Sequence, residues 1–137
     1  MLTRRILLGA AVALFIPTAA MAGATDPLFV NLTTDDPHRA MMGIGFAQKQ
    51  LERGHPVSIF FNDKGVHVIS VKNAAAFGEH QKIVADLIAK GGQIIACPTC
   101  MKHFGIVEGD LVSGAVVGNP ELTGEALFRD NAKTLTW

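Results

Sequence analysis

Both cysteines of this chain lie in one short segment, IIACPTCMKHFGI, as Cys97 and Cys100. The C-x-x-C spacing places the second thiol one turn after the first, and Met101 and His103 follow directly. Three kinds of site use such residues: a small structural disulfide, a redox-active or sulfur-carrying thiol pair, and a soft-metal site. The rest of the sequence gives grounds for ranking them.

A structural disulfide between Cys97 and Cys100 would close a very short loop. The stabilisation from restricting the unfolded chain grows with loop length, so this bridge would stabilise the fold little. Export would nevertheless expose the thiols to oxidising conditions, so an inert disulfide remains an alternative.

A reactive thiol pair has a stronger physical basis. The segment QIIAC is typical of a strand that ends at Cys97, and Thr99 is expected to cap a short helical turn after it. Backbone N–H groups at a helix start, with Lys102 and His103 as electrostatic supporters, lower the pKa of a nearby thiol. We therefore expect Cys97 to be the more acidic thiol and Cys100 to resolve what it carries.

A soft-metal site would recruit donors beyond the thiols. Copper(I) suits the set Cys97, Cys100, Met101 and His103, with His38, Met41 and Met42 as further candidates. A closed zinc site needs four ligands, and the chain has only two cysteines. Methionines at helical spacing more often belong to a core, and the other histidines, His80 among them, are expected to be solvated or to cap helices. We rank copper binding below sulfur handling and predict no cofactor.

The first 22 residues have the features of an export signal. An Arg-Arg pair precedes an apolar stretch over residues 7–16, which is too short to span a bilayer, and the triplet AMA at 20–22 is a cleavage signal. The pair fits both a twin-arginine signal and an ordinary secretory signal, and this choice stays open. We predict a periplasmic protein without a stable membrane anchor, whose domain covers residues 23–137.

Composition narrows the class of partner. The chain has 12 basic and 12 acidic residues, and removal of the export signal leaves 10 against 12 and a net charge of −2. No basic run with interleaved aromatic residues occurs, so nucleic acid is not an expected partner. With 49% hydrophobic and 18% charged residues over 137 positions, the composition predicts one compact domain.

The order of apolar segments predicts an α/β fold. Asp36 is expected to cap the first helix, with Pro37 at its first position. Residues 66–71 are expected to be a short extended piece or a loop. Short apolar strands that alternate with helices predict a single parallel sheet with helices on both faces. The expected strands are 28–34, 56–61, 93–97, 114–118 and 133–137, and the expected helices are 37–54, 81–90 and 121–129.

One site is expected beyond the carboxyl ends of these strands, where parallel sheets bind ligands. Three segments leave strands there: TTDDPH, ND and CPTCMKH. They supply the candidate residues Asp35, Asp36, His38, Asn62, Cys97, Cys100 and His103, with Lys102 beside them.

The order of these segments resembles the DsrE/DsrF/TusD-like sulfur-relay family, in its small exported branch. The resemblance is carried by VNLTTDDPHRAMMGIGFA, by VSIFFNDKGV, by GGQIIACPTCMKHFGIVEGDLVSGAVVG and by the closing KTLTW. A thioredoxin-type oxidoreductase fits badly, because its C-x-x-C comes early in the domain and here it comes late. The resemblance implies a flavodoxin-like fold, homo-oligomers such as trimers or hexamers, and a cysteine that accepts sulfane sulfur as a persulfide.

Carried onto this chain, the family's cysteine after the central strand is Cys97, and Cys100 is a second thiol that only part of the family shares. The resemblance predicts a sulfur-relay protein whose donor or acceptor is a protein or a small thiol. Membership alone does not establish turnover, so enzymatic activity is left open. The residues expected to bind or support the sulfur are Asp36, His38, Asn62, Lys102 and His103.

Overall fold

The computed structural model describes residues 23–137, so the predicted export signal lies outside the described residues. Within them, five parallel strands form one sheet in the order β4-β3-β2-β1-β5. The strands are β1 (Leu28–Leu32), β2 (Val57–Phe61), β3 (Gln93–Ala96), β4 (Val116–Val117) and β5 (Lys133–Thr136). The predicted single parallel sheet is confirmed.

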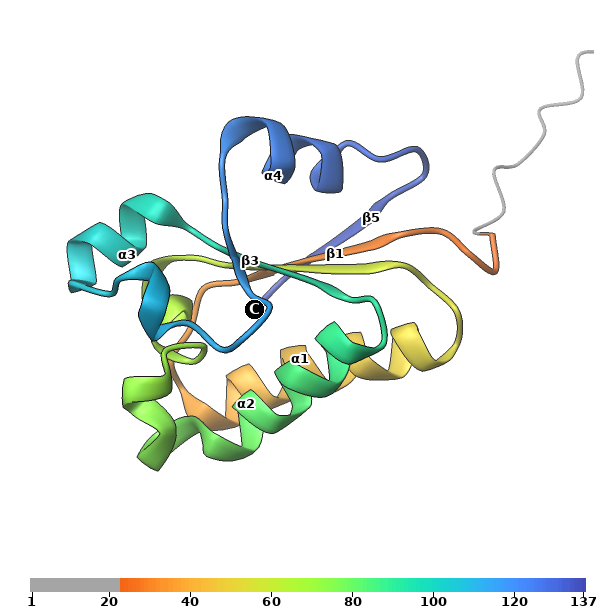
Figure 1. The fold of residues 1–137 in the computed structure, drawn as a ribbon. Helices are drawn as coiled ribbons and strands as arrows, with labels where there is room; N and C mark the ends of the chain where they lie inside the picture. Colours follow the sequence, from red (N-terminus) through yellow and green to blue (C-terminus); the bar gives the residue numbers. More distant parts are fainter. Residues whose placement is uncertain (1–22) are drawn as a thin grey trace, which may run out of the picture.

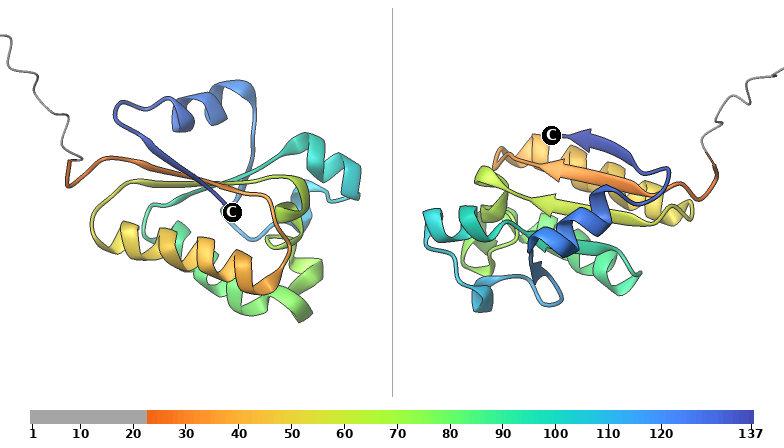
Figure 2. Two further views of the ribbon diagram at one scale, coloured as in Figure 1. Left: turned by 180° about the vertical axis from the view of Figure 1, so that it is seen from behind. Right: turned by 90° about the horizontal axis from the view of Figure 1, so that it is seen from above.

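Helices lie on both faces of the sheet, as predicted, but unequally. Two long helices, α1 (Pro37–Glu52) and α2 (Ala74–Ala89), lie side by side on one face, and the short helix α4 (Pro120–Leu127) lies alone on the other (Figures 1 and 2). The short helix α3 (Pro98–Phe104) follows the carboxyl end of β3. No helix among residues 23–137 is long and apolar enough to cross a membrane.

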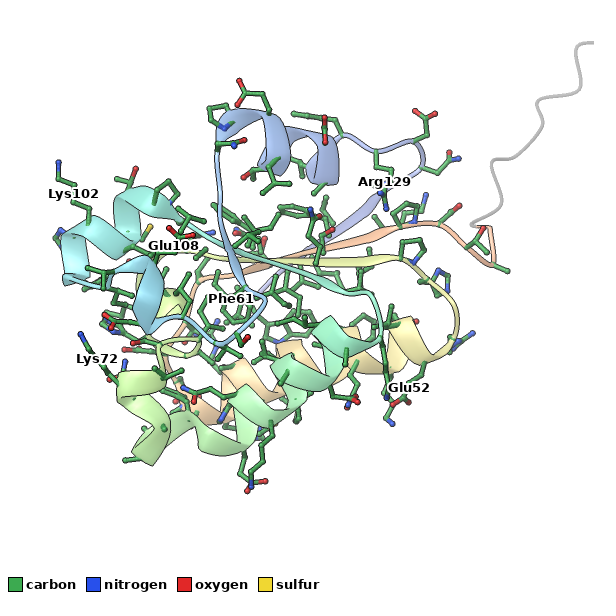
Figure 3. All side chains as sticks on the ribbon, viewed as in Figure 1. Glu52, Phe61, Lys72, Lys102, Glu108 and Arg129 are labelled. Atoms are coloured by element: carbon green, nitrogen blue, oxygen red, sulfur yellow. The ribbon has the colours of Figure 1, made fainter. Side chains whose placement is uncertain are left out.

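The main core lies between the sheet and the pair α1 and α2. Strand residues alternate in direction, so every second side chain of β1, β2 and β3 points into this layer. Figure 3 shows Phe61 there, and its side chain is fully buried. The strand residues of this core are Leu28, Val30, Leu32, Val57, Ile59, Phe61, Ile94 and Ala96.

Helix α1 begins as its sequence predicts. The Asp36 carboxylate accepts a hydrogen bond from Arg39 N–H at 2.8 Å, and Pro37 occupies the first turn. Gly43 lets the carboxyl-terminal Trp137 approach, since a Cβ at Gly43 would lie 3.2 Å from Trp137 Cγ. Trp137 N–H donates to Asn31 O at 2.9 Å. The end of the chain is therefore fixed beside β1.

Helix α2 begins seven residues before its predicted start at residue 81. Alanines open it, and alanine has the best intrinsic helix propensity. Phe77 and His80 are buried, and His80 Nε2–H donates to Pro37 O at 2.7 Å. The expectation that His80 is solvated or caps a helix was wrong, because this earlier turn packs against the start of α1.

The segment expected to be extended or a loop, residues 66–71, includes the end of the 3₁₀ helix η1 (Asp63–His67) and the start of the 3₁₀ helix η2 (Val71–Asn73), with residues 68–70 between them. Val66, Val68 and Ile69 are fully buried. Its one strand-like pairing is an isolated antiparallel bridge from Ser70 to Leu111. A third 3₁₀ helix, η3 (Glu108–Asp110), precedes Leu111.

Candidate functional site

A groove of about 580 Å³ lies on the α4 face of the sheet. Strand side chains that point away from the main core form its floor, and two residues of α4 form a wall. At the carboxyl end of the strands the groove meets both cysteines. The lining residues are Phe29, Asn31, Phe60, Asn62, Cys97, Cys100, Thr123, Leu127, Thr134 and Thr136.

Cys97 is held by backbone hydrogen bonds at the junction of β3 and α3. Its N–H donates to Phe61 O at 2.9 Å, which continues the pairing of β3 with β2 by one residue. Helix α3 starts at Pro98, so Cys97 itself is the N-cap and its Sγ accepts from Cys100 N–H at 3.4 Å. The predicted cap at Thr99 was wrong, because Pro98, which has no N–H to satisfy, already occupies the first helical position.

The two thiols are free and half-buried, and their sulfur atoms lie 2.8 Å apart. Cys100 S–H donates to Cys97 Sγ, while Cys100 Sγ accepts from Asp63 N–H at 3.0 Å. Burial raises the pKa of the Cys100 thiol, and its hydrogen bond to Cys97 raises that pKa further, against the opposing effect of Asp63 N–H. Cys97 Sγ thus accepts two hydrogen bonds, one from Cys100 N–H and one from Cys100 S–H.

The backbone at Asp63 is strained where it meets Cys100. Asp63 has a φ of 46°, which lies in the left-handed region that residues other than glycine rarely adopt. Two residues later, a Cβ on Gly65 would lie 2.2 Å from Leu32 O, so only glycine allows η1 to pack this closely on the end of β1. This close packing holds Asp63 N–H against the Cys100 sulfur.

An amide pair lies beside the thiols. Asn62 Nδ2–H donates to Asn31 Oδ1, which links the ends of β2 and β1. Asn62 was predicted as a site residue, whereas Asn31 was missed. A signal for Asn31 exists in the sequence, since it is the one polar residue of an apolar strand. Strand alternation places it on the face opposite Val30 and Leu32.

The predicted site residues converge only in part. Asn62, Cys97 and Cys100 meet at the groove, but Asp36 and His38 are exposed at the start of α1 and do not line it. Asp35 lines a separate hollow with His67 and Lys72.

The two supporters predicted on α3 also lie outside the groove lining. Lys102 and His103 are exposed, and Figure 3 shows Lys102 directed away from the sheet. The His103 ring packs edge-on against Phe104, with ring centroids 4.7 Å apart. The hydrogen bonds to the two sulfur atoms therefore come from backbone N–H groups and from Cys100 S–H, and not from Lys102 or His103.

The donors proposed for copper(I) are not gathered around the thiols. Met101 is 5% exposed and belongs to the main core, and His103 packs on Phe104. Among residues 23–137 no group of three or more His, Cys, Asp or Glu side chains is placed to hold a metal ion. Of the proposed copper ligands, both cysteines line the groove, whereas His38 and His103 are exposed and do not.

Most of the described residues match a known protein family. The profile of the DsrE/DsrF-like family matches residues 28–132. The chain belongs to the DsrE/DsrF-like family. An uncharacterized protein of Methanocaldococcus jannaschii is 30% identical over 91 residues, which are 64% of this chain and 80% of that protein. This family is of the sulfur-relay type.

Solved structures share the fold at low sequence identity. A protein of unknown function from Methanobacterium thermoautotrophicum has a TM-score of 0.68 at 17% identity, covering 82% of this chain and 99% of that one. The ychN protein of E. coli has a TM-score of 0.67 at 15% identity with the same coverage. A conserved protein of unknown function from Bacteroides thetaiotaomicron has a TM-score of 0.64 at 23% identity, covering 87% and 100%. These similarities establish the DsrE-like α/β fold.

Proposed function

We propose that this protein carries sulfane sulfur as a persulfide on Cys97, with Cys100 as the second thiol. The observation that carries the proposal is the thiol pair, whose sulfur atoms lie 2.8 Å apart at the end of an open groove. The chain that holds it is a member of a sulfur-relay-type family. Cys97 Sγ accepts hydrogen bonds from Cys100 N–H and S–H, so the second thiol is in direct contact with the sulfur that would be loaded.

Loading requires no net oxidation. The Cys97 thiolate attacks the outer sulfur of a donor persulfide, and a new S–S bond forms on Cys97. The S–S bond of the donor breaks, and the donor leaves as a thiolate. Sulfane sulfur moves from one thiol to another, so the donor and the protein exchange only a sulfur atom and a proton.

Two reactions can then discharge Cys97. An acceptor thiolate can attack the outer sulfur and carry it away, which restores the Cys97 thiolate. Alternatively, Cys100 attacks the inner sulfur, Cys97 Sγ, forming a disulfide and releasing hydrosulfide. In that second reaction the sulfane sulfur is reduced and the two cysteines are oxidised, so a thiol reductant is needed to restore the pair. Their separation of 2.8 Å favours the second reaction whenever no acceptor is present.

The test is sulfur loading of single-cysteine variants, followed by intact-protein mass spectrometry after incubation with polysulfide. Cys97→Ser should abolish loading. Cys100→Ser should accumulate a persulfide that the wild type loses, because the resolving thiol is gone. Normal loading of Cys97→Ser, or a faster reaction at Cys100 than at Cys97, would show that the roles are assigned wrongly.

Copper(I) binding is the competing outcome and can be measured on the same variants. If metal binding were the function, one equivalent of copper(I) should protect both thiols from alkylation. His103→Ala and Met101→Leu should then weaken binding strongly, since each would be a ligand. Binding unchanged by both variants would identify an incidental thiol site.

We further propose that the chain is exported and works in the periplasm as a homo-oligomer, with a protein or small thiol as its sulfur partner. The export sequence over residues 1–22 and the family resemblance support this proposal. Material purified from the native periplasm should begin at Gly23, and light scattering should give the mass of a trimer or hexamer. A chain that begins at Met1 would remove the argument for an oxidising compartment.

A further inference from the structure

Among the described residues, no Asp, Glu, Lys or Arg side chain lines the groove that leads to Cys97. We infer that the donor which enters it is an organic persulfide without ionised groups near its reacting sulfur, an inference that rests on the function proposed above. In such a donor, the groups next to the reacting sulfur are amides, hydroxyls or hydrocarbon. A cysteine within a polypeptide and a small uncharged thiol both meet this description. Thiosulfate, and persulfides flanked by carboxylates, are disfavoured.

The lining suits such a donor chemically. Phe29 and Phe60 present aromatic rings 6.4 Å apart between centroids, and Thr123, Thr134 and Thr136 present hydroxyl groups. Hydroxyl groups can hydrogen-bond to amides, and the rings can contact hydrocarbon. A carboxylate in the same place would lose hydration without gaining a cation, which is costly.

Cations on neighbouring elements are directed elsewhere. Lys133 lies on the other face of β5, 3.5 Å from the Asp26 carboxylate. Arg129 lines a separate hollow at the amino-terminal ends of β2 and β3, and Figure 3 shows it far from Lys102. Lys64 and Lys102 are exposed and do not line the groove.

A carboxylate also lies near the Cys100 thiol, at Asp63. Burial and the hydrogen bond to Cys97 raise the pKa of Cys100 most, and the carboxylate of Asp63 adds a smaller effect in the same direction at the end of the groove where sulfur is transferred. An anionic donor would therefore meet repulsion there and no compensating cation. The attack itself is the same for every organic donor, since the Cys97 thiolate takes the outer sulfur and the donor leaves as a thiolate.

The experiment compares donors that differ by one carboxylate. The hydropersulfides of N-acetylcysteine and of N-acetylcysteine amide are reacted with the Cys100→Ser protein, and each loading rate is divided by the rate with a small thiol in solution. The amide should load about three- to ten-fold faster than the carboxylate. A capped, uncharged peptide with one cysteine persulfide forms the third arm. A faster reaction of the peptide than of the amide identifies a polypeptide source, and the reverse identifies a small thiol.

Charge variants show whether the groove causes this preference. Thr123→Lys places a cation in the groove and should remove most of the difference between amide and carboxylate. Glu125→Gln raises the net charge equally on the same helix, but its side chain is exposed outside the groove, so the preference should persist. Thr134→Lys, on β5, repeats the test if Thr123→Lys folds poorly.

The possible outcomes distinguish a failure of this inference from a failure of the persulfide function proposed above. Equal normalised rates for amide and carboxylate, or preferred loading from thiosulfate, would overturn the inference and leave the persulfide function intact. A preference that Glu125→Gln alters as much as Thr123→Lys would also overturn it, since net charge and not the groove would be responsible. Failure of every donor to load Cys97 would overturn both.

Discussion

The two faces of the sheet differ in how completely helices cover them. The face under α1 and α2 carries a continuous core of fully buried aliphatic and aromatic side chains. On the other face, Phe29, Ile95 and Ala126 form a small buried cluster under α4, and the groove beside them stays open. Stability is therefore concentrated on one face, whereas the reactive thiols open onto the other.

Adjacent phenylalanines of β2 give the largest test of this difference. Phe61 is fully buried on the α1 and α2 face, and Phe60 is half-buried on the groove face. Phe61→Ala should lower the free energy of unfolding by about 3–5 kcal/mol, because it leaves a cavity in a closed core. Phe60→Ala should cost about 1–2 kcal/mol, because less apolar surface is buried there.

Urea unfolding followed by circular dichroism measures both variants of this pair. They remove the same side chain from neighbouring positions of one strand, so each controls for the other. Equal losses of stability would mean that α4 covers its face as tightly as α1 and α2 cover theirs.

The second prediction concerns the inequality of the two thiols on the groove face. Burial and the hydrogen bond to Cys97 raise the pKa of Cys100, so Cys100 stays protonated to higher pH than an ordinary cysteine. At mildly acidic pH, iodoacetamide should modify Cys97 about ten-fold faster than Cys100. Peptide mapping after short exposure measures the ratio, and denatured protein, in which the thiols should react alike, is the control.

A third prediction separates helix stability from the thiol chemistry. Asp36→Ala removes the cap of α1 and should cost about 1 kcal/mol of unfolding free energy. Sulfur loading of the folded variant should not change, because Asp36 does not line the groove. Reduced sulfur loading of a fully folded Asp36→Ala variant would show that Asp36 acts on the site, as the sequence predicted.

The smallest expected effect lies at the ion pair between η2 and η3. Lys72 Nζ lies 2.8 Å from Asp110 Oδ2, and this contact, with Val107 N–H, holds the pKa of Asp110 below its ordinary value of 3.8. Because the pKa of Asp110 is lower in the folded state than in the unfolded chain, the ion pair stabilises the fold at pH values above the ordinary pKa of 3.8. This stabilisation is lost as the pH falls through the lowered pKa of the folded state.

Asp110→Asn should therefore reduce the loss of stability between neutral and acidic pH. Lys72 is largely exposed, so the difference should be modest and smaller in high salt. Urea midpoints measured at several pH values, with Glu79→Gln as an exposed control, would reveal it. A pH dependence identical to that of the wild type would mean that the pair contributes nothing.

The sequence by itself determined the parallel sheet, the cap at Asp36 and the convergence of Asn62, Cys97 and Cys100. These follow from local rules. Short apolar runs are typical of buried strands, and parallel strands bring their carboxyl ends to the same edge of the sheet. Asn31 could have been added by the same alternation rule. Family membership was also within reach, since the order of segments carries it.

Only the tertiary structure decided which side chains face the groove. Lys102 and His103 follow the cysteines in sequence, but the docking of α3 leaves them exposed outside the groove lining. The hydrogen bond from Asp63 N–H to Cys100 depends on a strained φ that no spacing in the sequence reveals. The early start of α2 likewise depends on packing against α1. Chain direction and strand ends are local properties, whereas the rotation of a helix about its axis and the position of a backbone N–H depend on packing between distant segments.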